Sequence, residues 1–228
     1  MPGKFTKYQV ATFIAVLFHI IGLVGILYSK SDFIINATPV NMILMFALLV
    51  WTQAEKNIHF FLFMLVAIVT GFATELIGVN SGLLFGKYSY GKVLGFQAGH
   101  VPLLIGINWF IIIYCSGIAV HTALVRAIRR IAAETGAEPM KVKRFTLVVD
   151  GAVLAVFFDW LMEPVATKLG YWQWSSETAP LFNYGCWFLI SILLLTVFQR
   201  FRFSKHNKFA IHLLLIQLMF FLLLRTFL

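Results

Sequence analysis

Seven long runs of apolar residues, separated by short polar stretches, extend along the whole 228-residue chain. A helix of about 20 apolar residues crosses the ~30 Å hydrocarbon core of a bilayer and satisfies its own backbone hydrogen bonds there. The pattern therefore predicts an all-α polytopic membrane protein with about seven transmembrane helices in a single transmembrane domain, residues 1–228. The predicted helices cover approximately residues 9–28, 38–53, 58–79, 101–124, 145–163, 182–199 and 209–228.

The first apolar run has the charge order of a signal peptide, because Lys4 and Lys7 precede it. It extends from about Val10 to Tyr28, close to the ~20 residues needed to span a bilayer. It also lacks a small-x-small cleavage site. We therefore expect it to be retained as the first membrane helix.

The composition excludes an ordinary soluble domain. Apolar residues make up 61% of the chain and charged residues only 12%, whereas an average soluble domain has roughly 25% charged residues. The formal net charge of +9 would suggest a nucleic-acid ligand in a soluble protein. Here the basic residues gather in short loops between the apolar runs, so membrane orientation accounts for them and no nucleic acid is expected.

The basic residues are unevenly divided between the two sides of the predicted topology. Thirteen of the 18 Lys and Arg residues fall on one side. The positive-inside rule therefore predicts a multi-pass protein of the inner (cytoplasmic) membrane, with a cytoplasmic N-terminus and with loops 80–100 and 164–181 together at the outer face. The thirteen are Lys4, Lys7, Lys56, Arg126, Arg129, Arg130, Lys141, Lys143, Arg144, Arg200, Arg202, Lys205 and Lys208.

An internal repeat links the two outer loops. In each unit an acidic residue is followed eleven residues later by glycine and then by two aromatic residues at alternate positions, and a proline further on precedes a tryptophan by seven residues. Such a pattern predicts parallel helix-loop-helix repeats in helices 3–4 and 5–6, and repeat interfaces often hold the functional site in transporters. The alternative is an aromatic belt at the membrane surface. The two units are Glu75, Gly86, Tyr88, Tyr90, Pro102 and Trp109, and Asp159, Gly170, Trp172, Trp174, Pro180 and Trp187.

Three acidic residues near the outer ends of the third and fifth predicted helices are the strongest candidates for chemistry. Glu75 lies in the third helix, and Asp159 and Glu163 share one face of the fifth. Pro164 is expected to limit how far that helix continues. Charge is costly at membrane depth, so intramembrane acids are functional candidates. The alternative is that all three are interfacial acids, solvated or paired with lysines of the same loops.

The direction of these helices favours the functional interpretation. Both run outward, so their C-terminal, partially negative ends face the acids. A carboxylate is repelled there, and partial burial disfavours its charge further, so we expect carboxylic acids that stay protonated near neutral pH. The same helix ends would stabilise a transient cation. This arrangement suits a proton donor to an apolar substrate.

The histidines do not form a metal site in the sequence. No two of the six lie within five residues of each other, although membrane di-iron hydroxylases and desaturases need closely spaced histidines, and the HExxH zinc signature is absent as well. His100, at the mouth of the fourth helix, is a candidate for proton relay. The last apolar run, 209–228, contains no lysine, which excludes the usual retinal-binding type.

The same residues carry a resemblance to a known family. The first set is Glu75, Gly82, Phe85, Gly86, Tyr88 and Tyr90, and the second is Asp159, Glu163, Pro164, Gly170, Trp172, Trp174, Pro180, Asn183 and Trp187. Over about residues 75–187 they resemble the signatures of the membrane carotenoid hydratases, a group often labelled "carotenoid biosynthesis protein" that includes bisanhydrobacterioruberin hydratase and gamma-carotene 1'-hydratases. Two departures stand out: Glu163 replaces the aspartate of many members but retains a carboxyl group, and Ala179 differs from the residue expected before the proline, which weakens inference about the substrate.

The resemblance implies a hydro-lyase that adds water across the terminal double bond of an acyclic (psi) carotenoid end. The carotenoid would lie within the bilayer among membrane lipids, and no metal or other cofactor is implied. Glu163 or Asp159 would donate the proton to give a tertiary carbocation, and Glu75 would be the base or would orient water. Oligomeric state stays open. The substrate-binding residues would be Phe85, Tyr88, Tyr90, Trp160, Trp172, Trp174, Asn183 and Trp187, with Asn183 positioning water.

Two other function classes stay open. A carotenoid end-group cyclase also protonates an alkene with a carboxyl group, but it quenches the cation within the polyene. A proton-coupled transporter or binding protein would use the same intramembrane acids and the same parallel repeats. The acids disfavour transport, because they gather on one side and only Asp150 lies deeper in the inner half.

Overall fold

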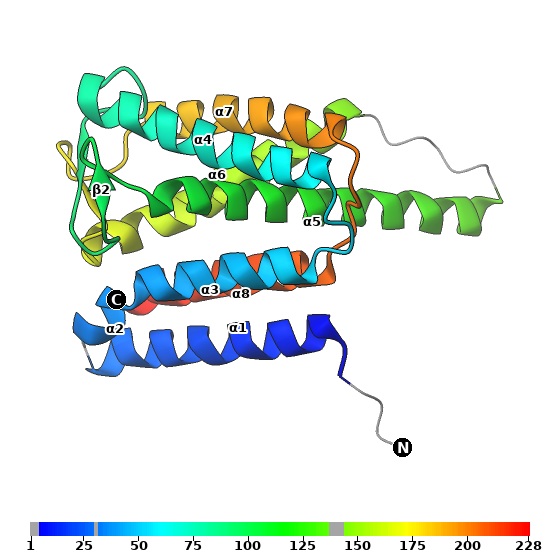
Figure 1. The fold of residues 1–228 in the computed structure, drawn as a ribbon, viewed down its shortest axis with the longest axis horizontal. Coiled ribbons are helices and arrows are strands. Elements are labelled where there is room, and N and C mark those ends of the chain that lie inside the picture. Colours follow the sequence, from blue (N-terminus) through cyan, green and yellow to red (C-terminus); the bar gives the residue numbers. More distant parts are fainter. Residues whose placement is uncertain (1–4, 30–31, 137–143) are drawn as a thin grey trace.

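The computed structural model describes residues 5–29, 32–136 and 144–228. This part of the chain forms a helical bundle with two short strand pairs at one end (Figure 1). The helices are α1 (Lys7–Val24), the π-helical turn η1 (Gly25–Ser29), α2 (Asp32–Asn36), α3 (Thr38–Thr52), α4 (Ile58–Ser81), α5 (Leu104–Thr135), α6 (Arg144–Lys168), α7 (Leu181–Arg200) and α8 (Lys208–Phe227). The strands are β1 (Tyr88–Tyr90), β2 (Gln97–Ala98), β3 (Val101–Pro102) and β4 (Trp172–Trp174).

The predicted class, an all-α polytopic membrane protein, is confirmed. In the described residues, six helical segments are long and apolar enough to cross a membrane: α1 with η1, α4, α5, α6, α7 and α8. The second predicted segment forms α3, which has 15 residues and is therefore only about 22 Å long. It falls short of the ~30 Å core on its own.

The helices form two groups that pack against each other. Figure 1 shows α4, α5, α6 and α7 side by side, and α1, α3 and α8 beside them, and α5 contacts α3 and α8 in the second group. All residues from Trp109 to Ile118 of α5 are buried, so α5 is the central helix. Gly71 lets α4 approach it closely, because a Cβ there would lie 2.4 Å from Cβ of Trp109.

Helix α6 continues through Pro164 to Lys168, one turn past the predicted end near residue 163. Proline lacks the N–H that would bond to the carbonyl of Trp160 one turn earlier. Arg225 of α8 supplies the missing donor, since its Nη1 lies 2.6 Å from that carbonyl oxygen. A freed backbone acceptor inside a membrane is tolerated when another group satisfies it, and this one is satisfied by a residue distant in sequence.

The two loops that contain the repeated aromatic residues are joined directly. β1 pairs antiparallel with β4, with Tyr88 opposite Trp174, Ser89 opposite Gln173 and Tyr90 opposite Trp172. In the repeat Tyr88 corresponds to Trp172 and Tyr90 to Trp174, so Tyr88 faces the counterpart of Tyr90, and Tyr90 faces the counterpart of Tyr88. A local two-fold axis generates this type of reciprocal pairing. The axis passes between Ser89 and Gln173.

Other contacts obey the same two-fold relation. The Gly91 amide donates to the Tyr171 carbonyl at 2.9 Å, and the corresponding Ser175 amide donates to the Lys87 carbonyl at 3.0 Å. Below them the two corresponding tryptophans, Trp109 and Trp187, stack with ring centroids 3.8 Å apart and an interplanar angle of 12°. The helix-loop-helix units α4–β1–α5 and α6–β4–α7 are therefore related in space as well as in sequence.

The ends of the bundle differ in charge. Loops 82–103 and 169–180 lie at the same end as the C-terminus, and the N-terminal end of α1 and the C-terminal end of α5 lie at the other (Figure 1). The described basic residues of α1, α5 and the α7–α8 connection lie at this second end, away from the strands. This distribution is the basis of the predicted orientation, which remains a prediction.

Candidate active site

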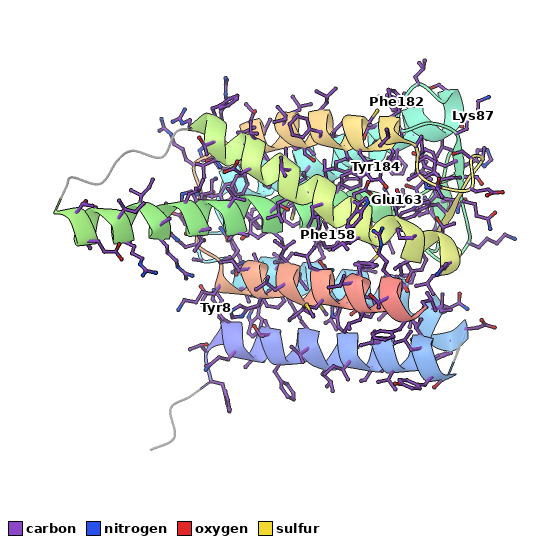
Figure 2. All side chains as sticks on the ribbon, turned by 180° about the vertical axis from the view of Figure 1, so that it is seen from behind. Tyr8, Lys87, Phe158, Glu163, Phe182 and Tyr184 are labelled. Carbon is purple, nitrogen blue, oxygen red and sulfur yellow. The ribbon has the colours of Figure 1, made fainter. Side chains whose placement is uncertain are left out.

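The predicted acids lie together in a small cavity at the strand-bearing end of the bundle. The cavity has a volume of about 20 Å³, which is enough for one water molecule. Glu163 lies inside the bundle at this end, whereas Lys87 lies beyond it in the loops (Figure 2). The lining residues are Glu75, Phe85, Tyr88, Tyr90, Ile105, Asn108, Trp109, Asp159, Met162, Glu163, Trp172, Trp174, Asn183 and Trp187.

Glu75 is held by three donors of its own helix-loop-helix unit. Its Oε2 accepts from the hydroxyls of Tyr88 at 2.5 Å and Tyr90 at 2.7 Å, and its Oε1 accepts from Trp109 Nε1 at 3.0 Å. Burial, followed by the charge of Glu75, raises the pKa of the Tyr88 and Tyr90 hydroxyls above the usual range. Both hydroxyls therefore remain donors, and both oxygens of Glu75 are occupied.

Glu163 is held in a similar way by the second unit. Its Oε2 accepts from the indole nitrogens of Trp172 at 2.9 Å and Trp174 at 2.7 Å. Its Oε1 has a longer contact, 3.4 Å, with Nδ2 of Asn183. The strand β4 thus supplies two neutral donors to one carboxylate oxygen and leaves the other oxygen more accessible.

Asp159 differs from both glutamates. It is 1% exposed, and its Oδ2 accepts from Asn183 Nδ2 at 2.8 Å. Its Oδ1 is buried and has no hydrogen-bond partner among the described residues. A buried polar oxygen without a partner is uncommon and calls for an explanation. Asp159 therefore contributes the one carboxyl oxygen of the described cavity residues that is left free for another molecule.

The acids have no basic partners in the part of the chain that the structure describes. The one ion pair between described residues is Arg130–Glu134, far away on α5. The lysines of the nearby loops are exposed, whereas Glu75, Asp159 and Glu163 are at most 5% exposed. Pairing with loop lysines, the alternative raised by the sequence, is not what the structure shows. Neutral N–H and O–H donors hold these carboxyls instead.

Comparison of the chain with models of protein families identifies the family to which it belongs. The model described as "Carotenoid biosynthesis protein" matches residues 34–228, from α2 to the last residue.

The chain belongs to the carotenoid biosynthesis protein family.

The family places this protein in carotenoid metabolism. Its multi-pass helical fold agrees with this role, because carotenoids are apolar molecules that dissolve in the membrane. No curated protein and no solved structure matches the chain. The matched region includes the whole cavity, so the carboxyls and aromatic residues described above belong to the family domain. The particular reaction has to be argued from the site itself.

In this carotenoid biosynthesis protein, two residues predicted for the site lie elsewhere. Trp160 is 43% exposed and its ring lies under the Arg225 guanidinium, 3.8 Å away. One residue after Asp159, it is rotated by about 100° around the helix and so faces α8. His100, the predicted relay, is exposed at φ 68° between β2 and β3 and does not line the cavity.

Four lining residues were not predicted as site residues: Ile105, Asn108, Trp109 and Met162. A signal existed for Trp109, because the repeat equates it with Trp187, which was predicted. Ile105, Asn108 and Trp109 are three and four residues apart and so share one face of α5. That face can be recognised only once it is known which side of α5 turns toward α4 and α6.

Proposed function

We propose that this protein is a carotenoid hydratase, a cofactor-independent hydro-lyase that adds water to the terminal double bond of an acyclic carotenoid end. The observation that carries the proposal is the free, buried Oδ1 of Asp159 in a cavity of the size of one water. Acid-catalysed hydration needs a proton donor, a water and an acceptor for the proton of that water. The cavity offers a candidate for each.

Asp159 is the proton donor in this mechanism. Its Oδ1–H transfers the proton to the less substituted carbon of the alkene, which forms a C–H bond and leaves a tertiary carbocation and an Asp159 carboxylate. Water then forms the C–O bond. Its surplus proton passes to Glu163, whose Oε1 is the more accessible oxygen. Proton exchange from Glu163 back to Asp159, whose carboxyls both accept from Nδ2 of Asn183, takes place through a second water molecule and restores the starting state.

The remaining lining residues stabilise the cation. Glu75, whose two oxygens accept from three donors, acts in this proposal as fixed electrostatic support rather than as the base that the resemblance implied. The rings of Tyr88 and Trp174, with centroids 4.9 Å apart, and the stacked pair Trp109 and Trp187 offer aromatic faces. The C-terminal ends of α4 and α6 are directed to the same region and add partial negative charge.

An end-group cyclase remains the second candidate, because it would use the same acid. Cyclisation quenches the cation with a double bond of the polyene and excludes water. The space for one water beside the carboxyls favours hydration over cyclisation.

Expression in cells that accumulate an acyclic carotenoid such as lycopene tests the proposal. We expect pigment heavier by one water with the wild type, and a loss of about 10²–10⁴-fold in product formation with Asp159→Asn. Asp150→Asn is the matched control, because Asp150 is exposed on the same helix, and it should behave as the wild type. A new pigment of unchanged mass would identify a cyclase, and unaltered activity of Asp159→Asn would remove Asp159 as the donor.

A further inference from the structure

A second, larger cavity lies beside the carboxyl cavity and between the two groups of helices. Its volume is about 260 Å³, and its walls come from α1 with η1, α2, α3, α5, α6 and α8 and from the start of β4. Most of the lining side chains are aliphatic or aromatic, with a few polar groups between them. Cavities that bind small molecules have this character. We call it the chamber.

The chamber and the carboxyl cavity share a wall. Four residues line both: Ile105, Asn108, Met162 and Trp172. Met162 directly precedes Glu163, and its side chain is unbranched and therefore adaptable. A molecule that fills the chamber thus ends within one side-chain layer of the free oxygen of Asp159.

The chamber also opens sideways to the surface predicted to face lipid. Four of its lining residues, on α1, α2 and α3, are strongly exposed: Phe18 (41%), Ile21 (49%), Phe33 (79%) and Val40 (64%). Aromatic and aliphatic side chains at this rim favour an apolar molecule arriving from the bilayer and not from water.

We propose that the chamber holds the chain of the carotenoid behind its reacting end, and that the carotenoid enters from the bilayer between α1 and α3. This proposal rests on the proposed function, because the carboxyl cavity at the inner end defines which end reacts. An engineered cavity of ~150 Å³ holds one benzene ring, so 260 Å³ holds on the order of ten carbon atoms. The chamber therefore encloses about two isoprene units, and the rest of the polyene stays in lipid.

Filling the chamber tests this proposal separately from catalysis. Gly22 of α1 lines the chamber, and a Cβ there would lie in ordinary contact, 3.5 Å from Phe220, so a side chain extends into the space. Gly185 of α7 is exposed and has nothing within 4 Å of a built Cβ. Gly22→Leu and Gly185→Leu are therefore the same change inside and outside the chamber.

The measurement is the amount of lycopene that copurifies with each detergent-solubilised variant from lycopene-containing membranes, with all pigment species counted together. We expect about tenfold less pigment with Gly22→Leu than with wild type, and no change with Gly185→Leu. Equal pigment in both variants overturns the proposal. Loss of copurifying lipid from Gly22→Leu, with its pigment unchanged, also overturns it, because the chamber would then hold lipid and not the carotenoid. If the wild type binds pigment but adds no water, the proposed function fails while the chamber stands.

A second pair of variants covers the possibility that Gly22→Leu does not fold. Val40→Trp narrows the rim of the chamber, and Val153→Trp places the same side chain on α6 at a position that is 55% exposed and outside the chamber. Lower pigment with Val40→Trp alone supports entry between α1 and α3. Equal pigment in this pair overturns that entry route.

Discussion

The half of the carboxyl cavity built by α4, β1 and α5 and the half built by α6, β4 and α7 share one pattern but hold their acids differently. In the first half a single acid, Glu75, accepts from two tyrosines and a tryptophan. In the second half the two tryptophans of the strand donate to Glu163, one helical turn after Asp159. Asp159, the sequence counterpart of Glu75, therefore accepts from Asn183 and not from the tryptophans of its own loop. A symmetric scaffold thus holds an asymmetric set of carboxyls.

The residues around the acids differ in the same sense. In the repeat Val79 corresponds to Glu163, and Ile105 corresponds to Asn183. The first half therefore lacks both the second acid and the amide that bridges two acids in the second half. One half is saturated with donors, and the other leaves an oxygen free. Under the proposed function, this difference assigns the chemistry to the second half and the electrostatic support to the first.

Replacing one acid of each half by its amide gives the largest difference. Glu163→Gln should lower product formation by about 10²-fold, because the acceptor of the water proton is lost. Glu75→Gln should lower it only by about tenfold, since the glutamine oxygen still accepts from Tyr88 and Tyr90 and only the hydrogen bond from Trp109 is lost. Rates of water addition, measured by pigment mass in membranes with matched protein levels, test this. The opposite order would place the base in the first half.

Replacing the hydrogen-bond donors to the acid of each half should give a smaller difference in activity between the two halves. The double variant Trp172→Phe, Trp174→Phe removes both indole donors from Glu163, and Tyr88→Phe, Tyr90→Phe removes both hydroxyl donors from Glu75. Each lost hydrogen bond to a charged group costs about 1.5–3 kcal/mol. We expect the tryptophan pair to reduce activity more and both pairs to reduce thermal stability similarly. Equal losses of activity would mean that the two halves contribute alike.

The smallest expected difference between the two halves is in how folding stability depends on pH. The raised pKa of Tyr88 and Tyr90 means that the folded protein keeps two protons that the unfolded chain releases above about pH 10. The contribution of these two tyrosines to folding stability should therefore be constant below pH 10 and fall above it, by up to about 1.4 kcal/mol per pH unit for each tyrosine. Thermal unfolding of the wild type and of Tyr88→Phe, Tyr90→Phe between pH 8 and 11, in one detergent, measures it. A fall of the same slope in the variant would assign it to other groups.

The sequence predicted the helices and most of the site because both depend on local patterns. Apolar runs mark membrane helices wherever they occur, and the repeat identified Glu75 and Asp159 before any contact was known. The path of α6 beyond Pro164 was not predictable, because it depends on Arg225, which lies 61 positions later in the sequence. For the same reason Trp160 was placed in the site although it faces α8.

The chamber had no sequence signal at all. Its walls come mainly from six helices, with lining residues spread from Phe18 to Phe221, and most of these are ordinary apolar residues of membrane helices. Only their arrangement in space leaves a volume between them. The free oxygen of Asp159 also depends on space, because the sequence shows that an acid is present but not which of its atoms has a partner.

The pairing of β1 with β4 has a consequence for how such a protein can diverge. The two loops are joined across the two-fold axis by backbone hydrogen bonds, and these bonds do not depend on which side chains the strands carry. Side chains of the paired strands can therefore change without opening the roof over the cavity, whereas Gly91 cannot, because a Cβ there would lie 2.0 Å from the Gly170 carbonyl oxygen. Under the proposed function, the α4–β1–α5 half therefore offers positions at which engineering can alter selectivity while Asp159 and Glu163, in the other half, are left unchanged.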